Sequence, residues 1–337
     1  MPNPTLSVVV PVFNEEAVLP KLEERLRSVL DGARIDFEVI LVDDGSRDSS
    51  RTLLRELNGR DPRFKVVGFS RNFGHQLAVT AGLEAATGQA VAILDADLQD
   101  PPEVLLQMLE LYHRGFDVIG GVRTARHGEN AMKLATAAVF YRLLRAITRL
   151  DIPADAGDFR LLSRRAVDAL LQLPERHRFV RGLASWIGFR QTTVQYERAA
   201  RAAGDTHYPY RKMLAFAFDG LTSFSIFPLQ LASYLGIVVS LLSFALLTWA
   251  VWLKLFTDRS VQGWASIVVA ITFLGGVQLI FLGVIGEYIG RIYDEVKRRP
   301  LYLVEERIGF EDGTCASVRG GASRSAARVE RNPEEPA

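Results

Sequence analysis

Two long stretches without a charged residue constrain this chain of 337 residues more than any other feature. They cover residues 229–253 and 261–286, and each exceeds the roughly 20 residues that a helix needs to cross a bilayer. A buried core helix is the alternative, but two neighbouring runs of this length favour membrane spans. Because the connector 254–260 is short, the pair is predicted to form a helical hairpin whose outer flanks face the same side.

Basic residues flank the hairpin, and the positive-inside rule places such flanks in the cytoplasm. The N-terminus lacks the basic start and long apolar core of a signal peptide, so the N-terminal part is also expected in the cytoplasm. These patterns predict a multi-pass protein of the plasma (inner) membrane with a cytoplasmic N-terminal domain. The basic flanking residues are Arg211, Lys212, Arg291, Lys297, Arg298 and Arg299.

Charge and cysteine content exclude some functions. The net charge is only +1, which argues against a nucleic-acid partner recruited by bulk charge. Cys315 is the single cysteine, so neither an internal disulfide nor a cysteine-based metal site is expected.

The N-terminal part reads as an α/β domain. Short valine-rich runs alternate with helical patterns, and such runs fit strands of a parallel sheet that is buried on both faces. In sheets of this kind ligands bind beyond the carboxyl ends of the strands. The expected strands are 6–12, 37–42, 64–69 and 91–94, and the expected helices are 15–30, 49–57 and 75–86.

The domain organisation follows from these patterns. An α/β domain is expected over residues 1–225, the hairpin over 227–290, a cytoplasmic juxtamembrane segment over 291–312 and a disordered tail over 313–337. Two stretches, 131–149 and 210–226, combine an apolar face with basic residues. They could lie on the bilayer surface or, for 131–149 with equal weight, cover a soluble core as ordinary amphipathic helices.

Acidic clusters follow three of the expected strands, beginning at Glu15, Asp43 and Asp95. Like charges that lie close together are costly unless something neutralises them, and Mg²⁺ or Mn²⁺ prefers carboxylate and diphosphate oxygens. A lone Asp-x-Asp motif is weak evidence for a metal site, since aspartates at strand ends are often turn formers or helix caps. Three acidic clusters at one sheet edge are stronger evidence and favour a bound cation. Asp100, which precedes two prolines, is expected to cap a helix.

Four segments, VVVPVFNEE, VDDGSRDSS, SRNFGHQLA and DADLQDPPE, resemble the inverting glycosyltransferases of family 2, which have a GT-A (Rossmann-like) fold. The segments DAGDFRLLSRRA and RFVRGLASWIGF and the paired C-terminal spans are similar to the polyisoprenyl-phosphate glycosyltransferases. These are the relatives of dolichyl-phosphate mannose synthase and of undecaprenyl-phosphate glucosyl and aminoarabinosyl transferases. The implied fold class is an α/β GT-A domain followed by two transmembrane helices.

The resemblance implies roles on the donor side. Asp97, with Asp95, should bind Mg²⁺ or Mn²⁺, which would stabilise the charge of the leaving diphosphate. Arg123 should lie beside the donor phosphates, although a surface arginine that ends a strand is the alternative. The other residues implied to contact the nucleotide-sugar are Pro11, Phe13, Glu15, Val42, Asp43, Asp44, Asp95, Ala96 and Gln99.

On the acceptor side the resemblance makes Asp158 the catalytic residue. It could accept a proton, orient the acceptor phosphate or share the metal shell, and a buried Asp158–Arg160 pair that holds a loop is the structural alternative. A lipid phosphate is largely dianionic near neutral pH, with a second pKa of about 6, so it needs a cationic cradle more than a strong base. The cations expected to contact it are Arg160, Arg178, Arg198, Arg201 and Lys212.

The resulting interpretation is an enzyme that transfers a sugar, with inversion, from a nucleotide-sugar to a polyisoprenyl phosphate. UDP-glucose and undecaprenyl phosphate are the expected substrates; GDP-mannose, UDP-GlcNAc or another donor remains an alternative. A homo-oligomer such as a tetramer is also expected from the resemblance. A processive polysaccharide synthase fits less well, because the Gln-x-x-Arg-Trp motif is missing from the sequence. A sugar-nucleotide sensor fits less well because Asp95, Asp97, Asp158 and Arg160 are all present.

Overall fold

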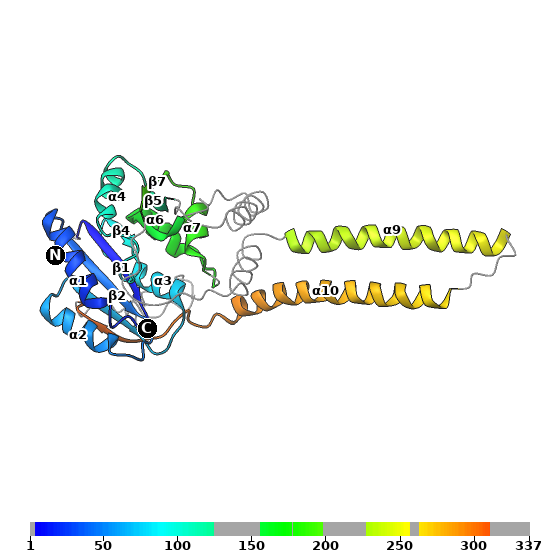
Figure 1. Ribbon diagram of the computed structural model, residues 1–337, viewed down its shortest axis with the longest axis horizontal. Coiled ribbons are helices and arrows are strands. Elements are labelled where there is room, and N and C mark those ends of the chain that lie inside the picture. Colours follow the sequence, from blue (N-terminus) through cyan, green and yellow to red (C-terminus); the bar gives the residue numbers. More distant parts are fainter. Residues whose placement is uncertain (1–3, 125–155, 177, 198–226, 257–262, 311–337) are drawn as a thin grey trace, which may run out of the picture.

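The computed structural model describes residues 4–124, 156–176, 178–197, 227–256 and 263–310, which form an α/β part and a long helical hairpin (Figure 1). The strands are β1 (Leu6–Val12), β2 (Phe37–Asp43), β3 (Phe64–Phe69), β4 (Ala90–Ile93), β5 (Val118–Arg123), β6 (Ala156–Ser163), β7 (Gln191–Tyr196) and β8 (Val304–Ile308). The helices are α1 (Leu19–Gly32), α2 (Ser50–Arg60), α3 (His75–Ala85), α4 (Val104–His113), α6 (Arg164–Gln172), α7 (Val180–Trp186), α9 (Phe227–Phe256) and α10 (Trp264–Lys297).

The strands form one mixed sheet in the order β7-β5-β6-β4-β1-β2-β3-β8. Strands β1 to β4 are parallel to one another, whereas β6 runs antiparallel to β4 and β5, and β8 runs antiparallel to β3. Every residue of β1 and β2 is buried, as expected for central strands that are covered on both faces.

Helices cover both faces of the sheet because consecutive strand residues point to opposite sides. Val8 and Val10 of β1 pack with α1, α2 and α4, whereas Val9 packs with α3, α6 and α7. The predicted α/β class is therefore confirmed, and the expected strands and helices occur close to their predicted bounds. The first helix begins later than expected, at Leu19. Residues Glu15 to Val18 form a hydrogen-bonded turn, and Pro20 lies in the first turn of the helix, where proline is favoured.

The structure differs from the expected domain division after the hairpin. Helix α10 continues without a break to Lys297, and the chain then returns to the sheet as the edge strand β8. Residues 304–308, expected in a separate juxtamembrane segment, therefore belong to the α/β sheet. Val304 pairs with Phe69, the last residue of β3, so the hairpin joins the α/β part at the carboxyl edge of the parallel strands.

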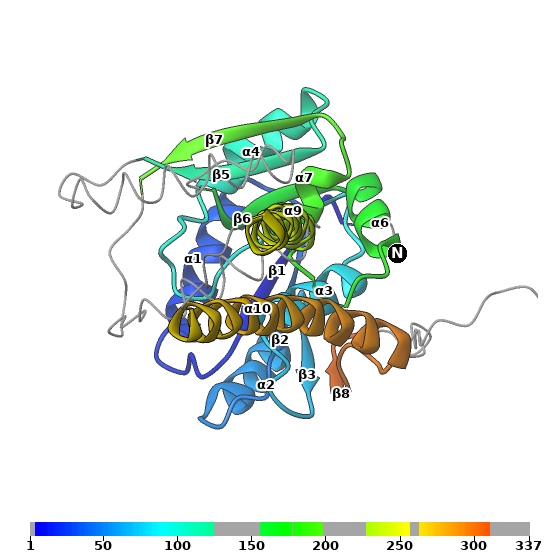
Figure 2. The same ribbon diagram turned by 90° about the vertical axis from the view of Figure 1, so that its right-hand side faces the viewer.

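Helices α9 and α10 run antiparallel away from the α/β part, and Figure 2 looks along α9 toward the sheet, with α10 crossing it obliquely. They contain 30 and 34 residues and expose many large apolar side chains. By length and composition, one segment of the described chain, Phe273–Lys297, could cross a membrane, while Tyr234–Ala245 is a shorter apolar stretch. Of the two predicted spans, the described residues thus support one.

Some predictions concern residues outside the described ranges. The stretches 131–149 and 210–226 and the tail 313–337 fall there, as do Arg198, Arg201 and Lys212.

Gly82 offers a test of the packing between α3 and β1. A Cβ atom at Gly82 would overlap the Val9 side chain, whereas a Cβ atom at Gly59 on α2 would meet nothing within 4 Å. Gly82→Ala should lower the melting temperature of the detergent-purified protein by several degrees, since overpacking costs about 1–3 kcal/mol. Gly59→Ala, the matched control, should keep or raise it. Equal melting temperatures for the two variants would contradict this account.

Candidate functional site

Acidic side chains meet at the carboxyl edge of the sheet. Asp43 ends β2 and Asp95 follows β4, while β6 begins at this edge because it runs antiparallel to β4. The pairing of Ile93 with Arg160, carried two residues further, brings Asp158 opposite Asp95. His75, the first residue of α3, lies between these two carboxylates: its Nε2 is 3.7 Å from Asp95 Oδ1 and 3.4 Å from Asp158 Oδ2.

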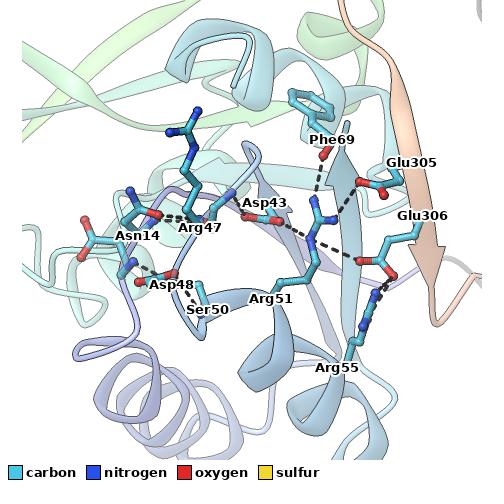
Figure 3. A network of polar contacts seen from close by, with 12 residues as sticks. Asn14, Asp43, Arg47, Asp48, Ser50, Arg51, Arg55, Phe69, Glu305 and Glu306 are labelled. Carbon is cyan, nitrogen blue, oxygen red and sulfur yellow. Dashed lines mark hydrogen bonds and ion pairs between the residues drawn. The ribbon is translucent and has the colours of Figure 1, made fainter. Parts of the chain in front are cut away.

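Hydrogen bonds join the loops that follow β1 and β2 (Figure 3). Asn14 lies in the left-handed backbone region at φ 56°. Its side-chain Oδ1 accepts a hydrogen bond from the backbone amide of Arg47 at 2.8 Å, and its backbone amide donates to Ser46 Oγ at 3.0 Å. The Glu15 amide donates to Ser50 Oγ at 2.9 Å. The two loops therefore form one rigid unit, and Phe13 at its border is 43% exposed.

The residues expected to contact the nucleotide fall into two groups. Pro11 and Val42 are paired and buried inside β1 and β2, so they lie beneath the loops at the carboxyl edge of the sheet. Phe13 and the half-buried Glu15 lie in the loop after β1, where a ligand can reach them. Ala96 is buried beside the aspartates that follow β4.

Asp43 and Asp44 are both buried and hold neighbouring loops. Asp43 accepts bonds from the Ser46 amide at 2.9 Å and from Arg51 Nε at 2.8 Å. Asp44 accepts the amides of Phe73 at 2.6 Å and Gly74 at 2.9 Å, which fixes the turn before α3. Burial raises the pKa of Asp44 against the opposing effect of these two bonds. Both carboxylates thus hold the backbone of the neighbouring loops in place.

Asp95, Asp97 and Gln99 form the second cluster. Asp95 Oδ1 and Gln99 Oε1 are buried and have no hydrogen-bond partner among the described residues, whereas Asp97 Oδ1 accepts the Gln99 amide at 3.1 Å. Burial raises the pKa of Asp95 to about 6, with His75 opposing and the carboxylates of Asp158, Asp100 and Asp97 adding to the rise. Unsatisfied oxygens beside clustered carboxylates fit a hard divalent cation.

Protein ligands alone do not complete such a cation site. Within the described residues, no group of three or more His, Cys, Asp or Glu side chains is arranged to hold a metal. A cation held by Asp95, Asp97 and Gln99 would therefore take further oxygens from a ligand or from water.

Asp100 takes a role other than the predicted one. The prediction that it caps a helix is wrong: α4 begins at Val104 after Glu103, and no side chain caps it. Instead, Asp100 accepts the Tyr196 hydroxyl at 2.5 Å and Arg123 Nη2 at 3.3 Å. Arg123 Nε also donates to the Tyr196 hydroxyl at 3.2 Å, so β5, β7 and the loop after β4 are joined. No local sequence pattern predicts this role for Tyr196.

Asp158 is surrounded by donors. Gln76 Nε2 donates to its Oδ2 at 3.1 Å, and Arg181 Nη2 of α7 donates to its Oδ1 at 3.3 Å. Burial raises the pKa of Asp158, but the hydrogen bond to His75 and the charges of Arg181 and Arg160 outweigh it and hold this pKa below its usual range. Burial lowers the pKa of His75, and Asp158 and Asp95 more than reverse this effect. Neither His75 nor Gln76 was expected at the site from the sequence.

Arg160 and Arg178, expected to contact a phosphate, are instead buried and bonded to the backbone. Arg160 donates to the carbonyls of Asp158, Gly157 and Arg181 at 3.3, 3.1 and 3.4 Å, and burial lowers its pKa to about 10. Arg178 Nη2 donates to the Leu170 carbonyl at 2.7 Å. Both arginines stabilise the β6–α7 region, and Arg181, like His75, reaches the carboxylate of Asp158.

Asp95→Asn tests the cost of gathering these carboxylates. In EDTA this variant should melt a few degrees higher than the unmodified protein, because it removes a buried negative charge next to Asp158 and Asp97. Mn²⁺ should then raise the melting temperature of the unmodified protein more than that of the variant. Asp168→Asn, at a side chain that is 55% exposed, should leave both values unchanged. A lower melting temperature for Asp95→Asn in EDTA would refute the argument.

Comparison with known proteins gives consistent matches. Residues 7–171 match glycosyl transferase family 2. The chain is 51% identical over 306 residues to uncharacterized glycosyltransferase YkcC of Bacillus subtilis, covering 91% of this chain and 95% of the relative. It is 40% identical over 300 residues to a prophage bactoprenol glucosyl transferase homolog of Escherichia coli, covering 89% and 98%. A solved structure, glucosyl-3-phosphoglycerate synthase from Mycobacterium tuberculosis, is similar with a TM-score of 0.42 and 20% identity over 66% of this chain and 80% of that chain. From its matched sequence and its near-full-length relatives, the chain belongs to glycosyl transferase family 2 and is a glycosyltransferase.

Proposed function

We propose that this enzyme transfers a sugar, with inversion, from a nucleotide-sugar to a polyisoprenyl phosphate at the cytoplasmic face of the plasma membrane. The observation that carries the proposal is the position of Asp158 and Arg181 opposite Asp95, on the sheet edge from which the apolar hairpin leaves. The name of the Escherichia coli relative, a bactoprenol glucosyl transferase homolog, supports a lipid acceptor and a glucosyl donor.

The donor would lie over the joined loops after β1 and β2. Phe13 offers an exposed ring against which a base can pack, and Asp43 and Asp44 keep the loops in shape. Arg123 lies beside Gly157, where an added Cβ would come within 3.0 Å of Arg123 Nη2. It would face the donor phosphates across the loop after β4. We take UDP-glucose as the donor.

Asp95, Asp97 and Gln99 would hold Mg²⁺ or Mn²⁺ together with the donor diphosphate. The buried oxygens Asp95 Oδ1 and Gln99 Oε1, which have no hydrogen-bond partner among the described residues, support this assignment. When bound, the cation would stabilise the charge that develops on the leaving nucleoside diphosphate.

The acceptor phosphate would enter between Asp158 and the membrane. Both oxygens of Asp158 already accept bonds, from Gln76 and Arg181, which suits a residue that orients neighbouring groups. A dianionic phosphate needs alignment with the anomeric carbon more than it needs a base. Arg198, Arg201 and Lys212 remain proposed phosphate contacts, and undecaprenyl phosphate remains the proposed acceptor.

The hairpin would hold the enzyme at the lipid. We propose that α9 and α10 both span the membrane, and that Lys297, Arg298 and Arg299 at the end of α10 lie on the cytoplasmic side. The sheet edge that carries the candidate site joins the hairpin at this end, so a lipid phosphate at the bilayer surface would lie close to Asp158. Assembly into a homo-oligomer is part of the same proposal.

Transfer of radiolabelled sugar into organic-extractable lipid tests the function. Detergent-purified enzyme, undecaprenyl phosphate and Mn²⁺ would be assayed with a panel of UDP- and GDP-sugars. We expect transfer from UDP-glucose, its loss in EDTA, and a fall of about 100-fold or more for Asp97→Ala. Asp168→Asn should retain full activity. Nucleotide binding without transfer from any donor would contradict the proposal and favour a sensor, and labelled polymer in place of lipid would favour a polysaccharide synthase.

Gln76 gives a sharper test of the acceptor side, because its amide links Asp158 to the Val180 amide of α7 at 3.0 Å. Gln76→Ala should lower kcat about tenfold or more with the KM for the donor unchanged, since it releases the orientation of Asp158. Gln191, which bonds to the Ala184 and Ser185 carbonyls of α7 at 3.3 and 3.1 Å without touching Asp158, is the control. Equal kcat values for Gln76→Ala and Gln191→Ala would count against Asp158 as the acceptor-side residue.

A further inference from the structure

We propose that Arg51 is a positioning residue for the nucleotide, and that β8, the strand that returns from the hairpin, is a working part of the donor site. The inference rests on the proposed function, because it assigns the donor to the loops after β1 and β2. It concerns residues on the far side of those loops from Asp95 and Asp158.

Arg51 joins the loop that follows β2, here called the nucleotide loop, to the returning strand β8 (Figure 3). Its Nε donates to Asp43 Oδ2 at 2.8 Å, its Nη1 donates to Glu305 Oε2 at 2.8 Å, and its Nη2 donates to the Phe69 carbonyl at 2.8 Å. Glu306 Oε1 also lies near this guanidinium, 3.6 Å from Arg51 Nε. One planar guanidinium thereby fixes the ends of β2 and β3 against β8, a geometry that the single ammonium group of lysine cannot reproduce.

A continuous series of hydrogen bonds leads from Arg51 to the proposed base-binding loop. Asp43 has no exposed surface and accepts the Ser46 amide with its other oxygen at 2.9 Å. The Ser46 hydroxyl in turn accepts the Asn14 amide at 3.0 Å, next to the exposed Phe13. Without Arg51, the Asp43 carboxylate would remain buried without a cation, and the turn that it holds would rearrange.

The returning strand is well anchored, so it can hold Arg51 in place. Tyr302 stacks on Phe69 with ring centroids 4.8 Å apart, and its hydroxyl donates to Glu84 at 2.6 Å. The Ser70 amide donates to the Leu303 carbonyl at 3.1 Å. Because α10 leads directly into this segment, the end of the hairpin and the nucleotide loop are connected through few residues.

Arg55 provides a matched comparison on the same helix. It donates to Glu306 through Nε at 3.1 Å and Nη2 at 2.7 Å, but no contact joins it to Asp43. Arg51 and Arg55 therefore both hold β8, and Arg51 alone of the two passes that contact to the nucleotide loop.

The test measures nucleotide binding without lipid, by calorimetric titration of the full-length, detergent-purified protein with UDP, and in parallel with GDP, in Mn²⁺. Arg51→Gln should raise the Kd about tenfold or more, because it removes charge-assisted bonds to a buried carboxylate. The Kd of Arg51→Lys should lie between that of Arg51→Gln and that of the unmodified protein. Glu305→Gln should raise the Kd about threefold. Arg55→Gln should stay within about twofold. In the transfer assay, the KM for the donor should rise in the same order and the KM for the acceptor should not change.

Two outcomes would overturn the inference. One is a folded Arg51→Gln protein whose Kd stays within about twofold of the original. The other is an equal rise for Arg55→Gln, which would mean that β8 acts only through general stability. If Arg51→Gln does not fold, Arg51→Lys and the exposed Glu305→Gln decide the matter by the same criterion. Because binding is measured without lipid, a failure of sugar transfer by the unmodified enzyme would overturn the proposed function and leave this result readable.

Discussion

Repulsion among carboxylates at one edge of the sheet is the constraint on which the rest of this structure depends. Asp95 and Asp158 approach each other at the ends of β4 and β6, and Asp43 and Asp44 lie further along the same edge, at the end of β2. Each is compensated differently: Asp158 by Arg181 and Gln76, Asp44 by backbone amides, and Asp43 by Arg51. At Asp95 the compensation is weaker: its Oδ1 accepts no hydrogen bond from the described residues, and His75 Nε2 lies 3.7 Å away. That unsatisfied oxygen is the observation that supports the proposed cation.

The cations at this edge divide by what they touch. Arg160 and Arg178 are buried and bonded to carbonyls, so they maintain the backbone around Asp158 and α7. Arg181 and His75 reach carboxylate oxygens directly and set the charge at the edge. A guanidinium has five N–H donors, and the buried Nε of Arg178 has no hydrogen-bond partner among the described residues. The expected contacts of Arg160 and Arg178 with an acceptor phosphate stay predictions.

The path of the chain adds a second feature. A membrane hairpin could follow the catalytic domain as a separate anchor, but here the chain returns and completes the sheet with β8. An edge strand exposes unpaired backbone groups, and β8 covers those of β3 on one side. The same strand carries Glu305 and Glu306 to Arg51, so the segment that closes the sheet also touches the nucleotide loop. The hairpin and the α/β part are thus joined by contacts as well as by the chain.

The sequence by itself determined the α/β class, the strands from β1 to β4 with the acidic residues after them, and the apolar helices. These follow from local patterns: buried strands read as valine-rich runs, and membrane-length helices read as long uncharged runs. The family resemblance added the choice of Asp158. Only the tertiary structure decided which donor side chain meets which carboxylate, because such pairs join distant residues. Gln76 lies 82 positions from Asp158, and Arg51 lies 254 positions from Glu305. It also decided that Asp100 binds Tyr196 and that β8 enters the sheet, since strand pairing and side-chain burial depend on packing that no local pattern specifies.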